Sequence, residues 1–327
     1  MNDAPTVSVI LPFRNAPKLS EAVESILNQS FSDFELILVN NEPERDNEYL
    51  RTIKDHRIRV IKEPRRGVVY AINRGINAAS GEFIMRMDAD DISYPDRIQN
   101  QVGFLYDNPS ISVVSGQIQY QGSAQNVGFR MYVAWLNSIH TSDQIRYNQF
   151  VEFPLANPSL MYRRSVFKDH GMYREGDFPE DYDHFLRLQS AGIQMGKVKD
   201  PVIKWVDSPT RLTRMDSRYS SDAFFKLKAQ YLAKWLKENN EYHPDIIVWG
   251  GSRLSRKRSQ YLQVHGVSIK GYIDLKESGK NIPYTKIGDL ENVFIVSYVS
   301  SRGARSKIRS YLLQHHYVEG KNFILAS

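Results

Sequence analysis

Three carboxylates fall within four residues of this 327-residue chain, in the run Asp88-Ala-Asp-Asp91, directly after an apolar stretch at 82–87. Carboxylates this close repel one another unless a cation, or a ligand that carries one, lies among them. Oxygen ligands suit Mg²⁺ or Mn²⁺, and Mg²⁺ commonly bridges carboxylates to substrate phosphates. We therefore expect Asp88 and Asp90 to bind one divalent ion, while Asp91 leads into the following helix. The alternative is an acidic helix start without a metal.

A second acidic pair, Glu180-Asp181, stands at the start of a predicted helix over 181–191. A helix N-terminus keeps a carboxylate ionised and fixed in direction. Such a carboxylate can act as a general base, taking a proton from an attacking hydroxyl. Position alone favours the simpler interpretation, in which the acidic residues only stabilise the helix start.

The elements around the first cluster alternate between strands and helices. Short apolar runs predict strands at 7–11, 34–39, 58–61 and 82–87. Helical spacing predicts helices at 19–27 and 71–79, whereas 111–153 shows no clear pattern. This alternation indicates an α/β fold with a mostly parallel sheet covered by helices, and such sheets bind ligands outside the carboxyl ends of their strands. Both Pro12-Phe-Arg-Asn15 and the acidic cluster directly follow strands, so both are expected at that edge.

A separate α/β pattern fills the C-terminal quarter of the chain. A long amphipathic helix at 220–238 and a linker precede predicted strands at 246–249, 267–273, 293–298 and 323–325. The first of these strands runs into Gly250-Gly-Ser-Arg-Leu-Ser255, and Asp274 follows about 20 residues later, where a ribose ligand would stand. The glycine spacing of a dinucleotide site is broken, because Ser255 replaces the third glycine. We predict a catalytic domain at 1–219, a helix and linker at 220–244, and a small Rossmann-like accessory domain at 245–327, used in docking, dimerisation or acceptor binding.

Composition and charge exclude several classes of site and partner. The absence of cysteine excludes disulfides and thiolate metal ligands. No apolar run approaches the roughly 20 residues that span a bilayer, and the N-terminus lacks a signal-peptide pattern, so we expect a cytoplasmic protein. Residues 245–327 carry thirteen Lys and Arg against six Asp and Glu. This segment is either a solvated basic surface or a peripheral contact with an anionic membrane, and nucleic-acid binding is not expected because no recognised motif accompanies the charge.

Four segments, in order along the first 97 residues, resemble the signature of family 2 glycosyltransferases. They are 7–15, 26–36, 73–82 and 85–97. The resemblance implies a glycosyltransferase-A fold, a nucleotide-diphosphate sugar donor and a divalent ion, Mn²⁺ or Mg²⁺. It implies that Asp88 contacts the nucleotide and that Asp90 holds the metal. It places Pro12 and Arg14 at the nucleotide pocket, and we also expect Asn40, Arg66, Asn73 and Arg211 to bind the donor.

The chain departs from the family pattern at two places. The acidic pair that usually follows the second strand is Asn40-Asn41 here, and an amide can donate as well as accept a hydrogen bond, so the base of the nucleotide stays open. The arginine that often precedes the asparagine of the third motif is Ile72. Arg65 and Arg66 either supply that positive charge or form an ordinary basic turn.

The resemblance also assigns the second acidic pair. It implies that Asp181 is the catalytic base, with Glu180 orienting the acceptor or sharing the role, and that Arg211 or Arg214 neutralises the leaving diphosphate. Asp207 is a weaker candidate for the metal shell. We expect an inverting transferase acting on a glycan or lipid-linked acceptor in envelope or capsular polysaccharide synthesis, with self-association left open. A nucleotidyltransferase is disfavoured because 12–17 holds no glycine, and a decayed, non-catalytic transferase domain is the remaining alternative.

Overall fold

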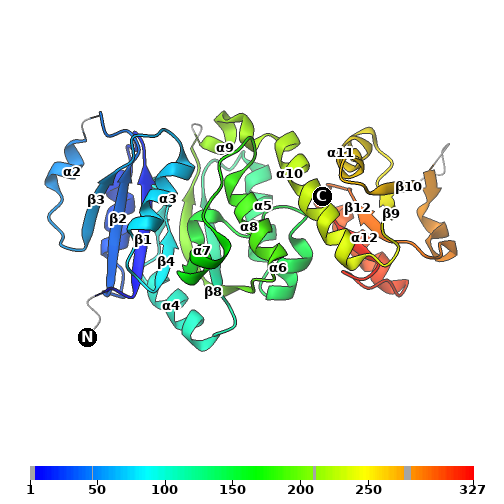
Figure 1. The fold of residues 1–327 in the computed structure, drawn as a ribbon, viewed down its shortest axis with the longest axis horizontal. Helices are drawn as coiled ribbons and strands as arrows, with labels where there is room; N and C mark the ends of the chain where they lie inside the picture. The colour runs from blue at the N-terminus through cyan, green and yellow to red at the C-terminus, as the bar shows by residue number, and fades with distance from the viewer. Residues whose placement is uncertain (1–3, 46, 209–210, 276–280) are drawn as a thin grey trace. The chain divides into compact units, whose positions relative to one another are not determined.

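The computed structural model describes residues 4–45, 47–208, 211–275 and 281–327 (Figure 1). The chain folds into two compact units. The first comprises Met1–Ile145, Leu155–Glu175 and Ala191–Met215; the second comprises Arg146–Pro154, Gly176–Ser190 and Asp216–Ser327. The domain boundaries expected at 219 and 244 stay a prediction. Within the described residues, no helix has the length and apolar character needed to cross a membrane.

The first unit is built on an eight-stranded mixed sheet, with strand order β3-β2-β1-β4-β7-β6-β8-β5. Its first four strands are parallel, β7 is antiparallel to both β4 and β6, and β5 is antiparallel to β8. The strands are β1 Val7–Phe13, β2 Phe34–Asn40, β3 Ile58–Lys62, β4 Phe83–Arg86, β5 Ile92–Ser93, β6 Val113–Gln121, β7 Met161–Arg163 and β8 Met195–Val206. The mostly parallel sheet predicted from the alternating pattern is confirmed.

Helices complete this unit, and the periodicity of the sequence explains their packing. Alternate residues of β1, such as Val9 and Leu11, share a core cluster with the apolar face of the first helix. In the helix Val68–Ala78, a side chain at Gly75 would collide with Ile10 of β1. Glycine at this position therefore permits the helix to approach the sheet closely. The helices are α1 Leu19–Leu27, α2 Glu48–Thr52, α3 Val68–Ala78, α4 Arg97–Asp107, α5 Val127–Asn137, α6 Ser142–Asn148, α7 Ser165–His170 and α9 Leu212–Met215; α6 runs on into the second unit.

The second unit holds a parallel five-stranded sheet of order β11-β10-β9-β12-β13. The first strand in sequence is central and the strand order reverses beside it, as in doubly wound nucleotide-binding folds, so the predicted Rossmann-like architecture is confirmed. The strands are β9 Asp245–Trp249, β10 Ser268–Asp274, β11 Asn281–Pro283, β12 Ile295–Ser297 and β13 Phe323–Leu325. The helices are α8 Glu180–Ser190, α10 Ser221–Asn239, α11 Arg253–Gln263 and α12 Arg302–Gln314, with short 3₁₀ turns at Ser217–Tyr219 and Tyr284–Asp289.

Side chains of the second unit contact the glycine loop that follows β9. Gly250 has a φ of +135°, which favours glycine, and a side chain at Gly251 would collide with Asp274. The guanidinium of Arg256 donates to the Gly251 carbonyl at 3.0 Å. Ser252 caps α11 by accepting from the backbone N–H of Ser255 at 3.1 Å. These contacts agree with the broken glycine pattern, and the accessory role of this sheet stays a prediction.

A buried amine lies in the second unit. Lys228 of α10 is 3% exposed, and its ammonium donates to the carbonyls of Val151 at 3.1 Å and Ala326 at 3.0 Å. Burial lowers the pKa of Lys228 to about 7, against an ordinary value of 10.5. The unfolded chain therefore holds one more proton than the folded chain between pH 7 and about 10.

This difference in proton binding predicts a pH-dependent stability. The free energy of unfolding should rise between pH 7 and about 10, by up to about 1.4 kcal/mol per pH unit from this group, and Lys228→Met should remove that component. Urea unfolding of both proteins across this range measures it. Loss of the two hydrogen bonds lowers the free energy of unfolding of the variant by the same amount at every pH. Only the slope of the free energy of unfolding against pH therefore tests the prediction. Parallel curves would contradict the prediction.

Candidate active site

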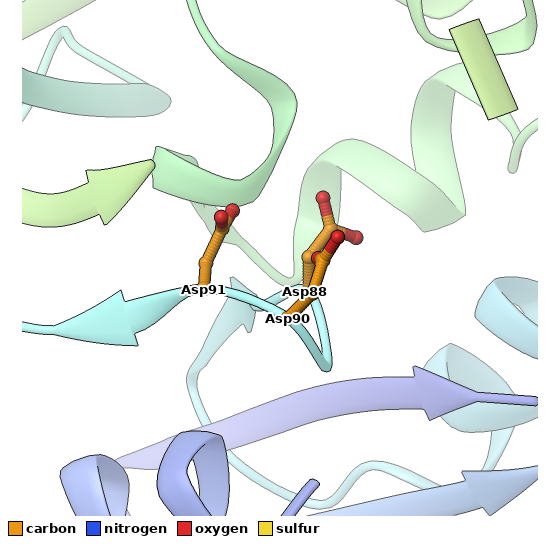
Figure 2. Close-up of side chains that lie close together, drawn as sticks. All are labelled: Asp88, Asp90 and Asp91. Carbon is orange, nitrogen blue, oxygen red and sulfur yellow. The ribbon is translucent and has the colours of Figure 1, made fainter. Parts of the chain in front are cut away.

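The acidic cluster lies on the turn between β4 and β5. Figure 2 shows the side chains of Asp88, Asp90 and Asp91 rising from this turn, with Asp88 and Asp90 drawn closely together. One carboxylate oxygen from each of the three lies within 4.8 Å of the others. Asp88 and Asp90 are half-buried, whereas Asp91 is 0% exposed. The structure thus brings together three carboxylates, one more than the two expected to share an ion.

Asp91 does not lead into a helix, and that expectation is wrong. Residues 92 and 93 form β5, and α4 begins only at Arg97, after an N-cap at Asp96. Asp91 instead accepts a hydrogen bond through Oδ1 from the backbone N–H of Val206, at 2.9 Å, and so joins the turn to the end of β8. Long-range pairing of β5 with β8 overrides the local helix-start signal, which is why sequence spacing misplaced Asp91.

The second oxygen of Asp91 provides a test of the predicted metal. Oδ2 is buried, and no described residue donates a hydrogen bond to it. Burial, followed by the charge of Asp88, raises the pKa of Asp91 well above its usual range, and the same two causes raise that of Asp90. A buried carboxylate oxygen without a partner is costly, and a divalent cation among three carboxylates would relieve that cost. The residues present therefore fit Mg²⁺ or Mn²⁺.

Two arginines support the cluster from within the fold. Arg86, at the end of β4, pairs with Asp88 Oδ1 at 2.6 Å. Arg97 is buried and donates to the Arg86 carbonyl at 2.8 Å and to Gln101 at 3.0 Å. Burial lowers the pKa of Arg97 to about 9, although the charge of Asp91 opposes this shift. Neither role was predicted, although an arginine closing an apolar strand is a signal that could have identified Arg86.

Arg211 is the predicted phosphate-binding residue whose charge acts on this cluster. Its positive charge lowers the pKa of Asp90 and Asp91, against the larger effect of burial. Its guanidinium lies 4.3 Å from the ring centroid of Trp205 and donates to the Val206 carbonyl at 3.1 Å. Stacking and this hydrogen bond hold the side chain in a defined direction, as phosphate recognition requires.

Arg214 and Asp207 are engaged with each other. Asp207 accepts hydrogen bonds from Arg214 at 2.9 Å, from Tyr120 at 2.7 Å and from Asn126 at 2.5 Å. Burial alone would raise the pKa of Asp207, but these bonds bring it below the ordinary value. Among the described residues, the cluster with metal-ligand spacing contains only the three aspartates of the β4–β5 turn. This arrangement favours Arg211 over Arg214 as the phosphate ligand and makes Asp207 an anchor for its segment.

Four of the remaining predicted donor residues lie at strand ends or on adjoining loops, and Asn73 lies in α3. Pro12 is near the end of β1, and Asn40 closes the neighbouring strand, where its Oδ1 accepts from the Glu42 N–H at 2.9 Å. Arg14 lies 3.6 Å from Glu42, and Arg66 lies 3.5 Å from Glu44. A cavity of about 280 Å³ opens at this edge. Its lining includes Phe13, Asn15, Asn40, Glu42, Arg45 and Tyr49.

Two asparagines hold neighbouring loops in place. Asn41 donates to the carbonyls of Glu63 and Arg65 at 3.0 and 2.7 Å, and it accepts from the Gly67 N–H at 3.0 Å. Asn73 donates to the Tyr173 carbonyl at 2.8 Å and accepts from its N–H at 3.2 Å. Both amides are satisfied by backbone groups in this structure. The nucleotide contact expected of Asn73 stays a prediction.

The second acidic pair belongs to the second unit, at the start of α8. Glu180 is 3% exposed, and the Tyr219 hydroxyl lies 2.8 Å and 2.7 Å from its two oxygens. Asp181 is half-buried, and its Oδ1 accepts from the Tyr182 N–H at 2.7 Å. The pair therefore divides into one carboxylate enclosed by the protein and one more exposed. Tyr219 was not predicted, because 39 residues separate it from Glu180 and no local pattern links them.

The metal fit predicts a thermal shift. Mn²⁺ should raise the melting temperature of the wild-type chain, because a ligand that binds only the folded state stabilises it, by about 2.7 kcal/mol at a hundred times its Kd. Asp90→Ala and Asp91→Asn should lose this shift, as each removes a charged ligand. The control is Asp200→Asn, at an exposed carboxylate on β8, which should keep the shift. Equal shifts in all four proteins, measured by differential scanning fluorimetry against EDTA, would contradict the metal fit.

Comparison with known proteins agrees with this geometry. The family model described as glycosyl transferase family 2 matches residues 8–171, half of the chain. An uncharacterised glycosyltransferase of Methanocaldococcus jannaschii is 26% identical over 260 residues, covering 76% of this chain and 85% of the relative. The O-antigen biosynthesis glycosyltransferase WbnJ of Escherichia coli is 24% identical over 242 residues, covering 71% and 89%. The bifunctional glycosyltransferase pgtA of Dictyostelium discoideum is 28% identical over 245 residues, but only 32% of its length is covered.

A solved structure shares the fold. Residues 1–349 of S. aureus TarS, crystallised in complex with UDP-GlcNAc, superpose with a TM-score of 0.55 at 18% identity, covering 79% of this chain and 70% of that one. This likeness confirms the predicted glycosyltransferase-A fold.

Proposed function

The chain belongs to glycosyl transferase family 2, and from that premise we propose that it transfers a sugar from a nucleotide-diphosphate donor, with inversion, to a glycan or lipid-linked acceptor. The observation that carries the proposal is the acidic turn after β4. Three carboxylates converge there, and one buried oxygen of Asp91 has no donor among the described residues. Such a turn at the carboxyl edge of a largely parallel sheet suits a cation bound to a diphosphate.

The donor half of the reaction is assigned to the first unit. Asp88, Asp90 and Asp91 would hold Mg²⁺ or Mn²⁺, and the ion would offset the negative charge of the diphosphate. Arg211 supplies a fixed positive charge to the leaving diphosphate, and Asp88 also contacts the nucleotide. The other residues assigned to the donor are Pro12, Arg14, Asn40, Arg66 and Asn73.

The transfer step is assigned to Asp181. The acceptor oxygen attacks the anomeric carbon from the face opposite the diphosphate, so the new bond forms with inversion. The bond from that carbon to the diphosphate oxygen breaks, and its electron pair leaves with the diphosphate. The hydroxyl proton passes to a carboxylate oxygen of Asp181, whose position in the first turn of α8 favours the ionised form.

One relative supports a role in surface polysaccharide synthesis, because WbnJ is named for O-antigen biosynthesis. The TarS crystal contained UDP-GlcNAc, which makes UDP-sugars the first donors to assay. We propose action on the cytoplasmic side of a membrane, with the basic segment 245–327 contacting anionic lipid, and self-association through the accessory sheet.

Asp181→Asn tests the assigned base. The amide cannot accept the acceptor's proton, so turnover should fall by about 10²- to 10⁴-fold. Donor binding should be unchanged, because the donor residues belong to the first unit. The measurements are release of nucleoside diphosphate from a panel of nucleotide sugars, with water as acceptor, and donor affinity by calorimetry. Asp177→Asn, at an exposed carboxylate three residues before the pair, is the matched control. Wild-type turnover in Asp181→Asn would remove this residue from the base role.

A further inference from the structure

The Tyr219 hydroxyl contacts the carboxylate of Glu180. The Tyr219 hydroxyl lies at nearly equal distances, 2.8 and 2.7 Å, from its two oxygens, so its proton is shared between them. Glu180 is buried, and hydrogen bonds to an ionised carboxylate are stronger than those between neutral groups. Burial, and then the negative charges of Glu180 and Asp181, raise the pKa of Tyr219 far above its ordinary value. The tyrosine therefore keeps its proton and acts as a donor at any working pH.

Tyr219 is itself fixed by its neighbours in sequence. It ends the 3₁₀ turn Ser217–Tyr219, which Asp216 caps by accepting from the Arg218 N–H at 3.0 Å. The same aspartate pairs with the Arg218 guanidinium at 2.7 Å, and that guanidinium lies 5.9 Å from the Tyr219 ring centroid. Ser220 then caps α10 by accepting from the Ala223 N–H at 3.3 Å. A capped turn joined to a capped helix gives the hydroxyl little freedom to leave Glu180.

Glu180 and Asp181 are consecutive residues in the first turn of α8, where only the second is partly exposed. Fixing the carboxylate of Glu180 limits the movement of this turn, which also carries Asp181. We propose that Tyr219 is a positioning residue for the transfer step, holding Glu180 so that Asp181 faces the acceptor. This inference rests on the proposed function, and it assigns Glu180 to the support of the base, leaving proton transfer to Asp181.

The test is Tyr219→Phe, which removes one oxygen and keeps the ring. With release of nucleoside diphosphate from UDP-sugars as the assay, kcat should fall by roughly 10- to 100-fold, because small misplacement of a reacting group costs about this much. The KM for the donor should change by less than about twofold, since the donor residues belong to the other unit. A lower kcat with an unchanged KM indicates a positioning role, because a general loss of structure would alter both kcat and KM.

Two further variants make the test specific. Tyr231→Phe is the matched control, because Tyr231 donates to Asp183 of the same helix at 2.6 Å; its kcat should stay within about twofold of wild type. Glu180→Gln should also lower kcat, and adding Tyr219→Phe to it should cause no further loss, because both changes break the interaction between Tyr219 and Glu180. If Tyr219→Phe fails to fold, the kcat of Glu180→Gln is compared with that of Asp177→Asn. This comparison tests the same interaction by changing the acceptor, Glu180, in place of the donor.

The outcomes separate this inference from the function it rests on. A kcat of Tyr219→Phe equal to wild type, or fully additive effects in the double variant, would overturn the positioning role while wild-type turnover still supports a transferase. Equal loss of kcat in Tyr231→Phe would overturn it as well. A wild-type chain that releases no nucleoside diphosphate from any nucleotide sugar would overturn the proposed function itself, and the positioning role with it.

Discussion

Repulsion among three carboxylates on one turn is the constraint around which the first unit is arranged. Asp91 is fully buried, and its neighbours Asp88 and Asp90 are half-buried, so each charge raises the cost of the others. The fold offsets part of this cost with Arg86, which pairs with Asp88, and with the more distant charge of Arg211. The remaining negative charge, together with one Asp91 oxygen that has no donor among the described residues, would favour a bound cation, as the proposed function requires.

The sheet explains why this turn lies at the edge to which the proposed donor site is assigned. Strands β1, β2 and β4 run parallel, so the segments after Phe13, Asn40 and Arg86 emerge at one edge. Adjacent strands are about 4.8 Å apart, which places the Asn40 end two strands, roughly 10 Å, from the acidic turn. The end of β8 is joined to the acidic turn, because its last residue, Val206, donates to Asp91, and the chain continues from there to Arg211. One edge therefore carries both a polar cavity and a charged turn.

Local patterns in the sequence were sufficient for the elements that depend on periodicity. The helix expected at 19–27 is α1, and the strand expected at 323–325 is β13. The segment 111–153 could not be interpreted, because β6 within it is stabilised by pairing with β7 and β8, far along the chain. The same reason hid the roles of Asp91 and Tyr219, whose partners lie 115 and 39 residues away. Residue type and spacing located the acidic cluster, whereas its buried third member required the fold.

Calorimetric titration of UDP, GDP, CDP and TDP, each with and without Mn²⁺, tests the central claim most directly. The account predicts that one of the four binds, that its binding requires Mn²⁺, and that Asp90→Ala abolishes it. The nucleotide that binds would also identify the base, which the Asn40-Asn41 pair leaves open. Absence of binding to all four, with the metal present and the chain folded, would contradict a donor site at this turn and favour a transferase fold that has lost its catalytic role.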